Sequence, residues 1–303
     1  MLYTKCDKEK IRETVLNLGF DACGFASVHE VNDESKLQYR KWISNGHHAQ
    51  MEYLARNLDV RDNPKMLLPD ANTLIVVALN YYPAAMLPKS HPQFAYYAYG
   101  EDYHKVIKRK LKSLANILLS TFGGEYRACV DSAPIRERYW AQEAGIGFVG
   151  RNNQLIIPGK GSYFFIGILL TSLVIEADKR CNLSCNNCGK CIKSCPGKAL
   201  NEIGALDANK CISYLTIEHK GALPENLKLE NCIYGCDRCQ QVCIHNLNAI
   251  PTAEKTFTPS DELMELTANK IEQLTEEEYT TIFSHSAVKR ASLSQLKRNL
   301  NNL

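Results

Sequence analysis

Apolar residues follow two different spacings along the chain. Some recur every three or four positions and predict a long helix that ends at two glycines: Ile107, Leu111, Leu114, Leu118, Gly123 and Gly124. Short apolar runs predict buried strands at 73–79, 126–130, 153–157 and 163–175. Helices and strands alternate irregularly, so we expect an α+β fold rather than a regular doubly wound sheet.

Capping residues predict the bounds of further helices. A polar cap or a proline at the start defines three of them, from Asp7 to Leu18, from Pro134 to Ala144 and from Asp207 to Gly221. After Pro251 the chain is expected to form a short helical tail with helices at 261–267, 275–283 and 292–300.

Length and composition indicate a globular protein. The 303 residues, 45% hydrophobic and 23% charged, suffice for about two domains. The net charge of +3 allows a local basic patch without requiring nucleic acid. The first twenty residues lack the apolar core of a signal peptide, and the most apolar segment, 163–175, is too short to cross a bilayer. We therefore expect a cytoplasmic monomer without a membrane segment.

The cysteines are concentrated in one part of the chain. Ten of the 13 lie between positions 181 and 243, a density that in a reducing compartment indicates metal binding rather than disulfides. The first group has the spacing C-x2-C-x2-C-x3-C-P and consists of Cys185, Cys188, Cys191 and Cys195. The second group consists of Cys232, Cys236, Cys239 and Cys243. This pattern is typical of two [4Fe–4S] clusters, for which thiolates are the preferred soft ligands.

A crossed arrangement of ligands is expected, because the fourth cysteine of such a run binds the other cluster in two-cluster ferredoxins. The ligands of one cluster are then Cys185, Cys188, Cys191 and Cys243. The other cluster takes Cys195, Cys236, Cys239 and either Cys211 or Cys232. We choose Cys211, because it lies on the helix expected after the first loop. Zinc, which also binds C-x2-C pairs, is the alternative metal, and Ile244 stands where ferredoxins have proline.

Three regions follow from these patterns: a catalytic domain at 1–180, a ferredoxin-like domain at 181–250 and the helical tail at 251–303. Because clusters only pass electrons, the first region must hold an electron acceptor or a second cofactor. The stretch "GIGFVG" at 145–150 matches a dinucleotide-binding fingerprint, but it follows a helix and precedes a strand. We therefore interpret it as a tight turn.

Two stretches of the first region carry polar groups suited to chemistry. Asp131 follows a predicted strand, where it can cap the next helix, pair with Arg136 or Arg138, or act as a general acid if its pKa is raised. The stretch "YAYGEDYHKVIKRK" combines aromatic and basic residues. It forms either a core edge and a solvated helix face, or the wall of a planar cofactor or a nucleic-acid surface.

Six stretches resemble the epoxyqueuosine reductases in order and spacing: "YAYGEDYHK", "VDSAPIRER", "AGIGFVGRN", "CNNCGKCIKSCPGKAL", "CISYLTIEHKG" and "YGCDRCQQVC". The resemblance covers about residues 5–250. It implies an oxidoreductase that converts epoxyqueuosine to queuosine at the tRNA wobble position, the last step of queuosine biosynthesis. It also implies two [4Fe–4S] clusters, and cobalamin in a domain related to that of reductive dehalogenases.

The resemblance also implies roles for individual residues. Asp131 is the expected proton donor, and the expected cobalamin contacts are Arg56, Tyr97, Asp131, Asn152, Ser162 and Ser213. The candidate tRNA contacts are Lys220, Lys289, Arg290, Lys297 and Arg298. For the four tail cations among them, the alternative is a solvated helix end that favours the helix dipole.

Other readings remain open at this level. Many relatives hold tRNA with a helical-repeat domain that follows the tail, whereas this chain reaches only position 303. The alternative functions are a reductive dehalogenase-like enzyme acting on a small organohalide and a ferredoxin-type electron carrier. The reductant is not identified by the sequence.

Overall fold

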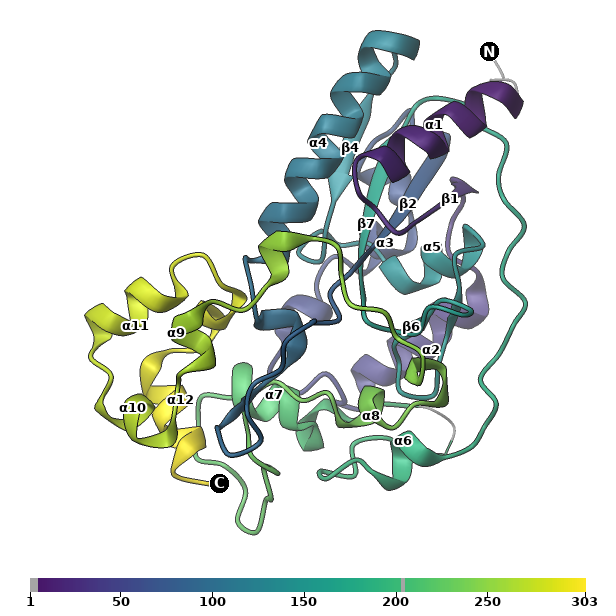
Figure 1. Ribbon diagram of the computed structural model, residues 1–303. Helices are drawn as coiled ribbons and strands as arrows, with labels where there is room; N and C mark the ends of the chain where they lie inside the picture. The colour runs from purple at the N-terminus through teal and green to yellow at the C-terminus, as the bar shows by residue number, and fades with distance from the viewer. Residues whose placement is uncertain (1–4, 203–204) are drawn as a thin grey trace.

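The computed structural model describes residues 5–202 and 205–303, and its centre is a four-stranded antiparallel sheet (Figure 1). The strands in spatial order are β1 (Ala22–Ser27), β2 (Thr73–Asn80), β7 (Phe164–Thr171) and β4 (Tyr126–Cys129). All eight residues of β2 are buried, which explains why its sequence is continuously apolar rather than alternating. The α+β expectation is confirmed.

Helices cover both faces of this sheet. The helices α1 (Lys5–Asn17) and α4 (Tyr103–Phe122) pack their apolar stripes against Ile75, Val77 and Leu79 of β2. The alternate residues of β2 point to the opposite face, where Trp140 of α5 (Glu137–Glu143) is fully buried. Two further helices lie before β2, namely α2 (Asp33–Ser44) and α3 (Leu58–Asp62).

The cysteine-rich part contains only short elements, and the thiols lie both in these elements and in the loops between them. They are α6 (Lys190–Lys193), α7 (Ile212–Ile217), β8 (Cys232–Tyr234) and α8 (Arg238–Gln241). Strand β8 pairs in parallel with β3 (Gln93–Phe94), and β5 (Phe148–Val149) pairs with β6 (Leu155–Ile156). Single 3-10 turns occur at Glu52–Leu54, Pro64–Met66, Tyr96–Ala98, Ala208–Lys210, Ile244–Asn246, Lys255–Phe257 and Ala287–Arg290.

The tail packs against the cysteine-rich part. Its helices are α9 (Asp261–Met264), α10 (Ala268–Gln273), α11 (Glu276–Phe283) and α12 (Leu293–Leu300). Three of them lie close to the expected positions, although α9 is shorter, and α10 was not expected. Asn299 of α12 is fully buried, and its amide donates at 2.8 Å to the carbonyls of Thr216 and Ile233. Arg298 donates to three carbonyls at and beyond the end of α7, those of Leu215, His219 and Gly221. The tail therefore anchors α7, the helix that begins next to Cys211.

Two expected helix starts differ from the structure. Helix α1 begins at Lys5, so Asp7 lies in its first turn instead of capping it. Helix α5 begins at Glu137, because the guanidinium of Arg136 is held outside the helix by Asp62 and the carbonyl of Ser35.

The single helix expected from 207 to 221 is interrupted. Asp207 does cap a turn, but this turn ends after Lys210, and Cys211 is extended with φ −77° and ψ 123° before α7 begins. The "GIGFVG" stretch is a helix-to-strand turn as expected, with Gly145 at φ 74° between α5 and β5. Within the described residues, no helix is both long and apolar enough to span a membrane.

Candidate metal centres and active site

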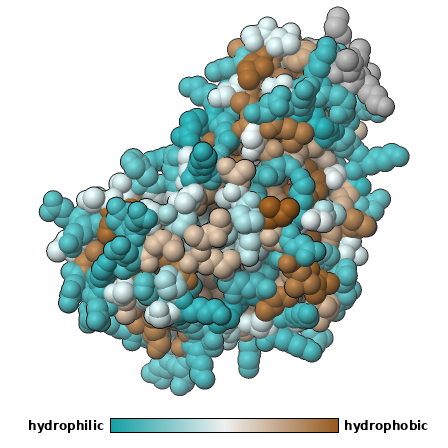
Figure 2. Space-filling model, in the orientation of Figure 1, coloured by the Kyte–Doolittle hydropathy of each residue, from teal (hydrophilic) through white to brown (hydrophobic). Residues whose placement is uncertain are grey.

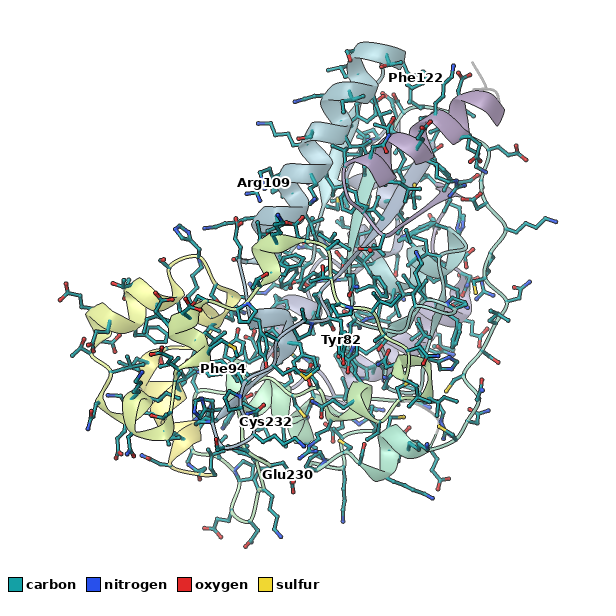
Figure 3. All side chains as sticks on the ribbon, in the orientation of Figure 1. Tyr82, Phe94, Arg109, Phe122, Glu230 and Cys232 are labelled. Atoms are coloured by element: carbon teal, nitrogen blue, oxygen red, sulfur yellow. The ribbon has the colours of Figure 1, made fainter. Side chains whose placement is uncertain are left out.

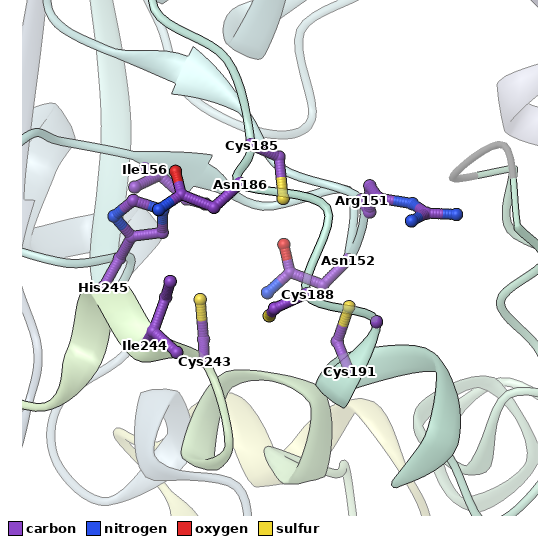
Figure 4. A pocket seen from close by; sticks show the side chains of 11 residues that line it. Arg151, Asn152, Ile156, Cys185, Asn186, Cys188, Cys191, Cys243, Ile244 and His245 are labelled. Atoms are coloured by element: carbon purple, nitrogen blue, oxygen red, sulfur yellow. The ribbon is translucent and has the colours of Figure 1, made fainter.

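Four thiols from two distant segments surround one small cavity. They are contributed by the loop before α6, by α6 itself and by the residue that precedes the turn at Ile244–Asn246: Cys185, Cys188, Cys191 and Cys243. Figure 4 shows their sulfurs directed toward this cavity, which Asn152 also lines. Burial raises the pKa of Cys243, and the charges of the other three thiols raise it further. This grouping is the one predicted for the first cluster.

Left-handed backbone positions shape the first thiol loop. Asn187 has φ 53° and Gly189 has φ 70°, and both lie between ligand candidates in the sequence "CNNCGKC". Glycine and asparagine are the residues that adopt this region at least cost. They turn the chain tightly enough for successive thiols to face the same space.

The second group of thiols lies deeper in the protein. Its members Cys195, Cys211, Cys236 and Cys239 interact electrostatically with one another. Burial raises the pKa of Cys211 to about 11, with smaller contributions from Cys236 and Cys195. Across the described residues, no three His, Cys, Asp or Glu side chains converge closely enough to hold a single metal ion. The thiols within each group are therefore too far apart to bind one metal ion together.

Cys232 and Cys181 are the two thiols that the predicted assignment leaves over. The thiol of Cys232 forms a hydrogen bond with that of Cys236 and also donates to the carbonyl of Glu230 at 3.7 Å (Figure 3). Cys181 instead uses its backbone N–H to donate to the carbonyl of Gln142 at 3.0 Å. Cys232 therefore lies beside the second thiol group, and the choice of Cys211 over Cys232 stays a prediction.

A close backbone approach holds two of the second-group thiols together. Gly197 follows Cys195 by two residues, and a Cβ built on it would overlap the carbonyl of Lys210, the residue before Cys211. Gly197→Ala should therefore separate these segments and lower the iron content of the second cluster, measured as iron per purified chain. Gly221→Ala is the control, because its Cβ would meet only the ring of His219. Equal iron content in both variants would contradict this prediction.

An acid–base cluster lies just after β4, on the catalytic domain. Asp131 has a left-handed backbone with φ 44°, and its N–H donates to the carboxylate of Glu137 at 2.6 Å. Its own carboxylate interacts with the imidazole of His104, Oδ2 to Nε2, at 2.8 Å. The hydroxyl of Tyr103 also bonds to this carboxylate. Asp131 is thus held from both its backbone and its side chain.

His104 is placed between two carboxylates. Its Nδ1 lies 2.7 Å from Asp102 Oδ1, while its Nε2 contacts Asp131. The ring stacks on Tyr103 with centroids 4.1 Å apart, and Tyr103 in turn stacks on Phe165 at 4.2 Å. Burial lowers the pKa of His104, but the two carboxylates outweigh it and raise the pKa to about 9. The imidazole is therefore charged at neutral pH.

The protonation of Asp131 differs from the expectation for a general acid. Burial alone would raise its pKa, but the hydrogen bond and charge of His104, with Tyr103 and Arg138, hold the pKa below its ordinary value. Its side chain is 55% exposed. Burial and the charge of Asp131 raise the pKa of Glu137 to about 8. At neutral pH the protons of this cluster therefore reside on His104 and Glu137, while Asp131 is ionised.

Three parts of the chain meet opposite Asp131. The hydroxyl of Tyr53 has its pKa raised to about 12, first by burial and then by the charge of Glu218, with a further contribution from Asp131. Glu218, just after α7, forms an ion pair with Arg290 of the tail at 2.8 Å. The site is thus bordered by the sheet domain, the cysteine-rich part and the tail. On the face of the molecule that Figure 2 displays, less polar residues lie toward the middle and hydrophilic residues around them.

The remaining residues predicted to contact the cofactor lie in different surroundings. Arg56 is exposed, and the Tyr97 hydroxyl donates to that of Tyr234 at 3.3 Å. The Asn152 amide donates to the carbonyl of Cys239 at 3.4 Å. Ser213 is half-buried in the first turn of α7.

Ser162 is buried and fully engaged by other side chains. Its hydroxyl accepts hydrogen bonds from Gln240 at 3.1 Å and Asn246 at 2.9 Å. A group of tyrosines lies beside it, and Tyr82 in Figure 3 stacks on Tyr163 at 4.8 Å. Ser162 therefore links the sheet to the second thiol group.

The candidate tRNA contacts divide into two kinds. Lys220 and Lys289 are exposed at the surface. Arg290 is paired with Glu218, while Lys297 donates to the carbonyl of Leu274 at 2.8 Å. Like Arg298, these residues make contacts within the protein. Lys297 and Arg298 bond to backbone carbonyls of other segments instead of forming a solvated helix end, and their role toward tRNA stays a prediction.

Some residues of the acid–base cluster were only weakly indicated by their sequence pattern. Tyr103 and His104 stood out only as part of an aromatic and basic stretch, and Glu137 and Tyr53 did not stand out. The pairing of His104 with Asp131 joins positions 27 apart and depends on α4 beginning beside the end of β4. The usable signal was Asp102, whose side chain caps α4 and fixes where His104 lies.

Two family models match parts of the chain. Residues 61–132 match the model described as epoxyqueuosine reductase QueG, DUF1730. Residues 184–246 match a 4Fe-4S double cluster binding domain. The fold and the paired thiol groups therefore define an iron–sulfur oxidoreductase.

Relatives match nearly the whole chain. An epoxyqueuosine reductase of Leadbetterella byssophila is 39% identical over 297 residues, covering 96% of this chain and 96% of that protein. The epoxyqueuosine reductase of Escherichia coli is 36% identical over 306 residues, covering 96% of this chain and 79% of that protein. The chain belongs to the epoxyqueuosine reductase family.

Solved structures of epoxyqueuosine reductases have the same fold. One, with an epoxyqueuosine-modified tRNA-Tyr stem loop, has a TM-score of 0.89 and 28% identity, covering 97% of this chain and 80% of that one. Another, from Bacillus subtilis, has its aspartate catalytic loop swung out of the active site. Its TM-score is 0.87 at 29% identity, with 97% of this chain and 80% of that chain covered.

Proposed function

We propose that this protein reduces epoxyqueuosine to queuosine at the wobble position of tRNA. The observation that carries the proposal is a family match over 96% of the chain, in which the two thiol groups and the Asp131 cluster belong to one molecule. The reaction removes the epoxide oxygen as water and leaves a carbon–carbon double bond. It consumes two electrons and two protons.

The two thiol groups fit two [4Fe–4S] clusters. Cys185, Cys188, Cys191 and Cys243 would hold the first, and Cys195, Cys211, Cys236 and Cys239 the second. The first group includes the exposed Cys188, whereas no member of the second group is exposed. We infer that electrons from an external reductant enter at the first cluster and continue inward through the second.

The cofactor proposed beside the second group is cobalamin, held by Arg56, Tyr97, Asp131, Asn152, Ser162 and Ser213. Support comes from Tyr97, whose hydroxyl bonds to Tyr234 and whose ring meets Tyr103 edge to face and Tyr234 at a tilt. Both nitrogens of His104 are bonded to carboxylates, so its imidazole is engaged within the protein. When bound, the corrin metal supplies a centre that collects single electrons and delivers them as a pair.

The chain's own contribution at the epoxide is the control of protons. Asp131 is held by Glu137 and His104 at the border of the three segments that surround the site. When one carbon–oxygen bond opens, the developing alkoxide takes a proton through Asp131. When the second carbon–oxygen bond breaks, the oxygen leaves as water after a second proton is delivered. A positioned acid contributes roughly 10²- to 10⁴-fold to such a step.

The proposed tRNA contacts are the exposed Lys220 and Lys289, with Arg290 joining them if its pair with Glu218 opens. Phosphate contacts of this kind orient nucleic acid without reading its sequence. We propose that the protein acts in the cytoplasm, because its substrate is a tRNA, and that it does so as a monomer.

The direct test uses the full chain reconstituted with iron, sulfide and cobalamin under anaerobic conditions. It is incubated with a strong reductant and tRNA that carries epoxyqueuosine, and the digested nucleosides are analysed by mass spectrometry. We expect conversion to queuosine, a mass loss of one oxygen atom. Unchanged epoxyqueuosine with a fully loaded protein would contradict the proposed function.

A further inference from the structure

The proposed reaction needs two protons at one oxygen atom, while the ionised Asp131 holds neither of them. Its pKa lies below the ordinary value, because His104 and Tyr103 stabilise the carboxylate against the effect of burial. A carboxylate in this state transfers a proton only if another group supplies it. The supplier must be in direct contact with the Asp131 carboxylate and must carry a titratable proton at neutral pH.

His104 meets both requirements. Its Nε2 lies 2.8 Å from Asp131 Oδ2, a distance at which a proton is shared directly. Its Nδ1 lies 2.7 Å from Asp102 Oδ1, so a second carboxylate favours the imidazolium. Asp102 is fixed in turn, because its side chain also accepts from the backbone N–H of His104 as the N-cap of α4. The three side chains form a continuous line.

Charged groups from α5 and from the tail surround this line. Glu137 and Arg138 of α5 act on Asp131 or His104, and Lys289 of the tail acts on Asp102. Tyr103 bonds to Asp131 and stacks on the imidazole. The His104 side chain remains 37% exposed, so water can return a proton to it after each transfer.

We propose that Asp102, His104 and Asp131 form a proton relay in which His104 stores the proton that Asp131 delivers to the epoxide oxygen. This inference rests on the proposed function. In the first transfer the Nε2 proton passes through Asp131 to the alkoxide, which becomes a hydroxyl group. Water then reprotonates His104, and a second transfer releases the oxygen as water. The two electrons come from the reductant through the clusters.

His104 acts through Asp131, so it is a positioning and proton-supplying residue, and its test is a pH profile. The relay is loaded only below the pKa of the imidazole, about 9, and is lost as the pH rises through that value. We expect the pH profile of wild-type turnover of epoxyqueuosine tRNA to have a descending limb near this pH. His104→Gln retains a donor to Asp131 but stores no proton, so turnover should fall at least tenfold and the limb should disappear.

Asp102→Asn supplies the matched variant. Asparagine is as good an N-cap as aspartate, so α4 should keep its start, while the carboxylate that raises the pKa of His104 is removed. We expect the limb to move to lower pH. A limb at the same pH in wild type, His104→Gln and Asp102→Asn would overturn the relay.

A readout without turnover separates the relay from the proposed function. Histidine labelled with 13C at Cε1 is titrated by NMR in the cofactor-loaded protein, and His104 is identified by the signal that His104→Gln lacks. We expect His104 to titrate near pH 9. If it titrates near the ordinary value of about 6.5, the relay is wrong even in an active enzyme. If His104 titrates near pH 9 but wild type leaves epoxyqueuosine unchanged, the proposed function fails instead. Equal cobalamin uptake by wild type and by His104→Gln shows that the variant is folded.

Discussion

Replacing Asp131 with asparagine is expected to lower the turnover of epoxyqueuosine tRNA by roughly 10²- to 10⁴-fold. The amide keeps the shape of the side chain but cannot pass a proton from His104 to the substrate. Asparagine also tolerates the left-handed backbone of this position, where φ is 44°, so the loop should retain its conformation. Turnover is measured from the nucleoside content of the tRNA after single and multiple cycles.

The control for this variant is Asp70→Asn, an exposed aspartate on the loop before β2. Both variants should take up cobalamin as wild type does, measured from the absorption spectrum after gel filtration. Near-normal turnover of Asp131→Asn would exclude Asp131 as the residue that delivers protons. Loss of cobalamin uptake together with turnover would instead assign it a role in binding the cofactor.

Replacing Cys239 with alanine is expected to remove one of the two clusters. Cys239 interacts with Cys195, Cys211 and Cys236, so its loss leaves three thiolates for a cluster that needs four. Iron should fall from about eight to about four atoms per chain, and turnover should be lost because electrons no longer reach the active site. Iron analysis and integrated electron paramagnetic resonance after reduction measure the effect.

Cys232→Ala is the matched control, because Cys232 lies beside Cys236 but is not among the predicted ligands. It should keep both clusters, whereas Cys211→Ala should lose one. The reverse pattern, with iron lost from Cys232→Ala and retained in Cys211→Ala, would show that the eighth ligand was chosen wrongly.

The sequence was sufficient to predict the elements whose pattern is set locally. The apolar run at 73–79 became the central strand β2 because all its side chains are buried, and the helical spacing from Ile107 to Leu118 became the inner face of α4. The cysteine spacings predicted which sulfurs of one loop face one another, and the two-cluster ferredoxin pattern predicted that Cys243 joins the first group and Cys195 the second. In these regions local geometry and tertiary structure agree.

Other features depended on contacts between distant residues. The start of α5 moved to Glu137 because Asp62, 74 positions before Arg136, holds its guanidinium. The low pKa of Asp131 depends on His104. The half-buried position of Arg298 depends on carbonyls in and near α7. Such interactions are created when the elements pack, so residue type and spacing alone did not predict them.

The central claim is that two iron–sulfur clusters supply electrons to a corrin cofactor beside Asp131. The most direct test is the metal content of the full chain after anaerobic reconstitution with iron, sulfide and cobalamin. We predict about eight iron atoms, about eight sulfides and about one cobalt per chain, retained through gel filtration. Zinc in place of iron, or a protein with a full complement of iron that retains no cobalt, would contradict the account.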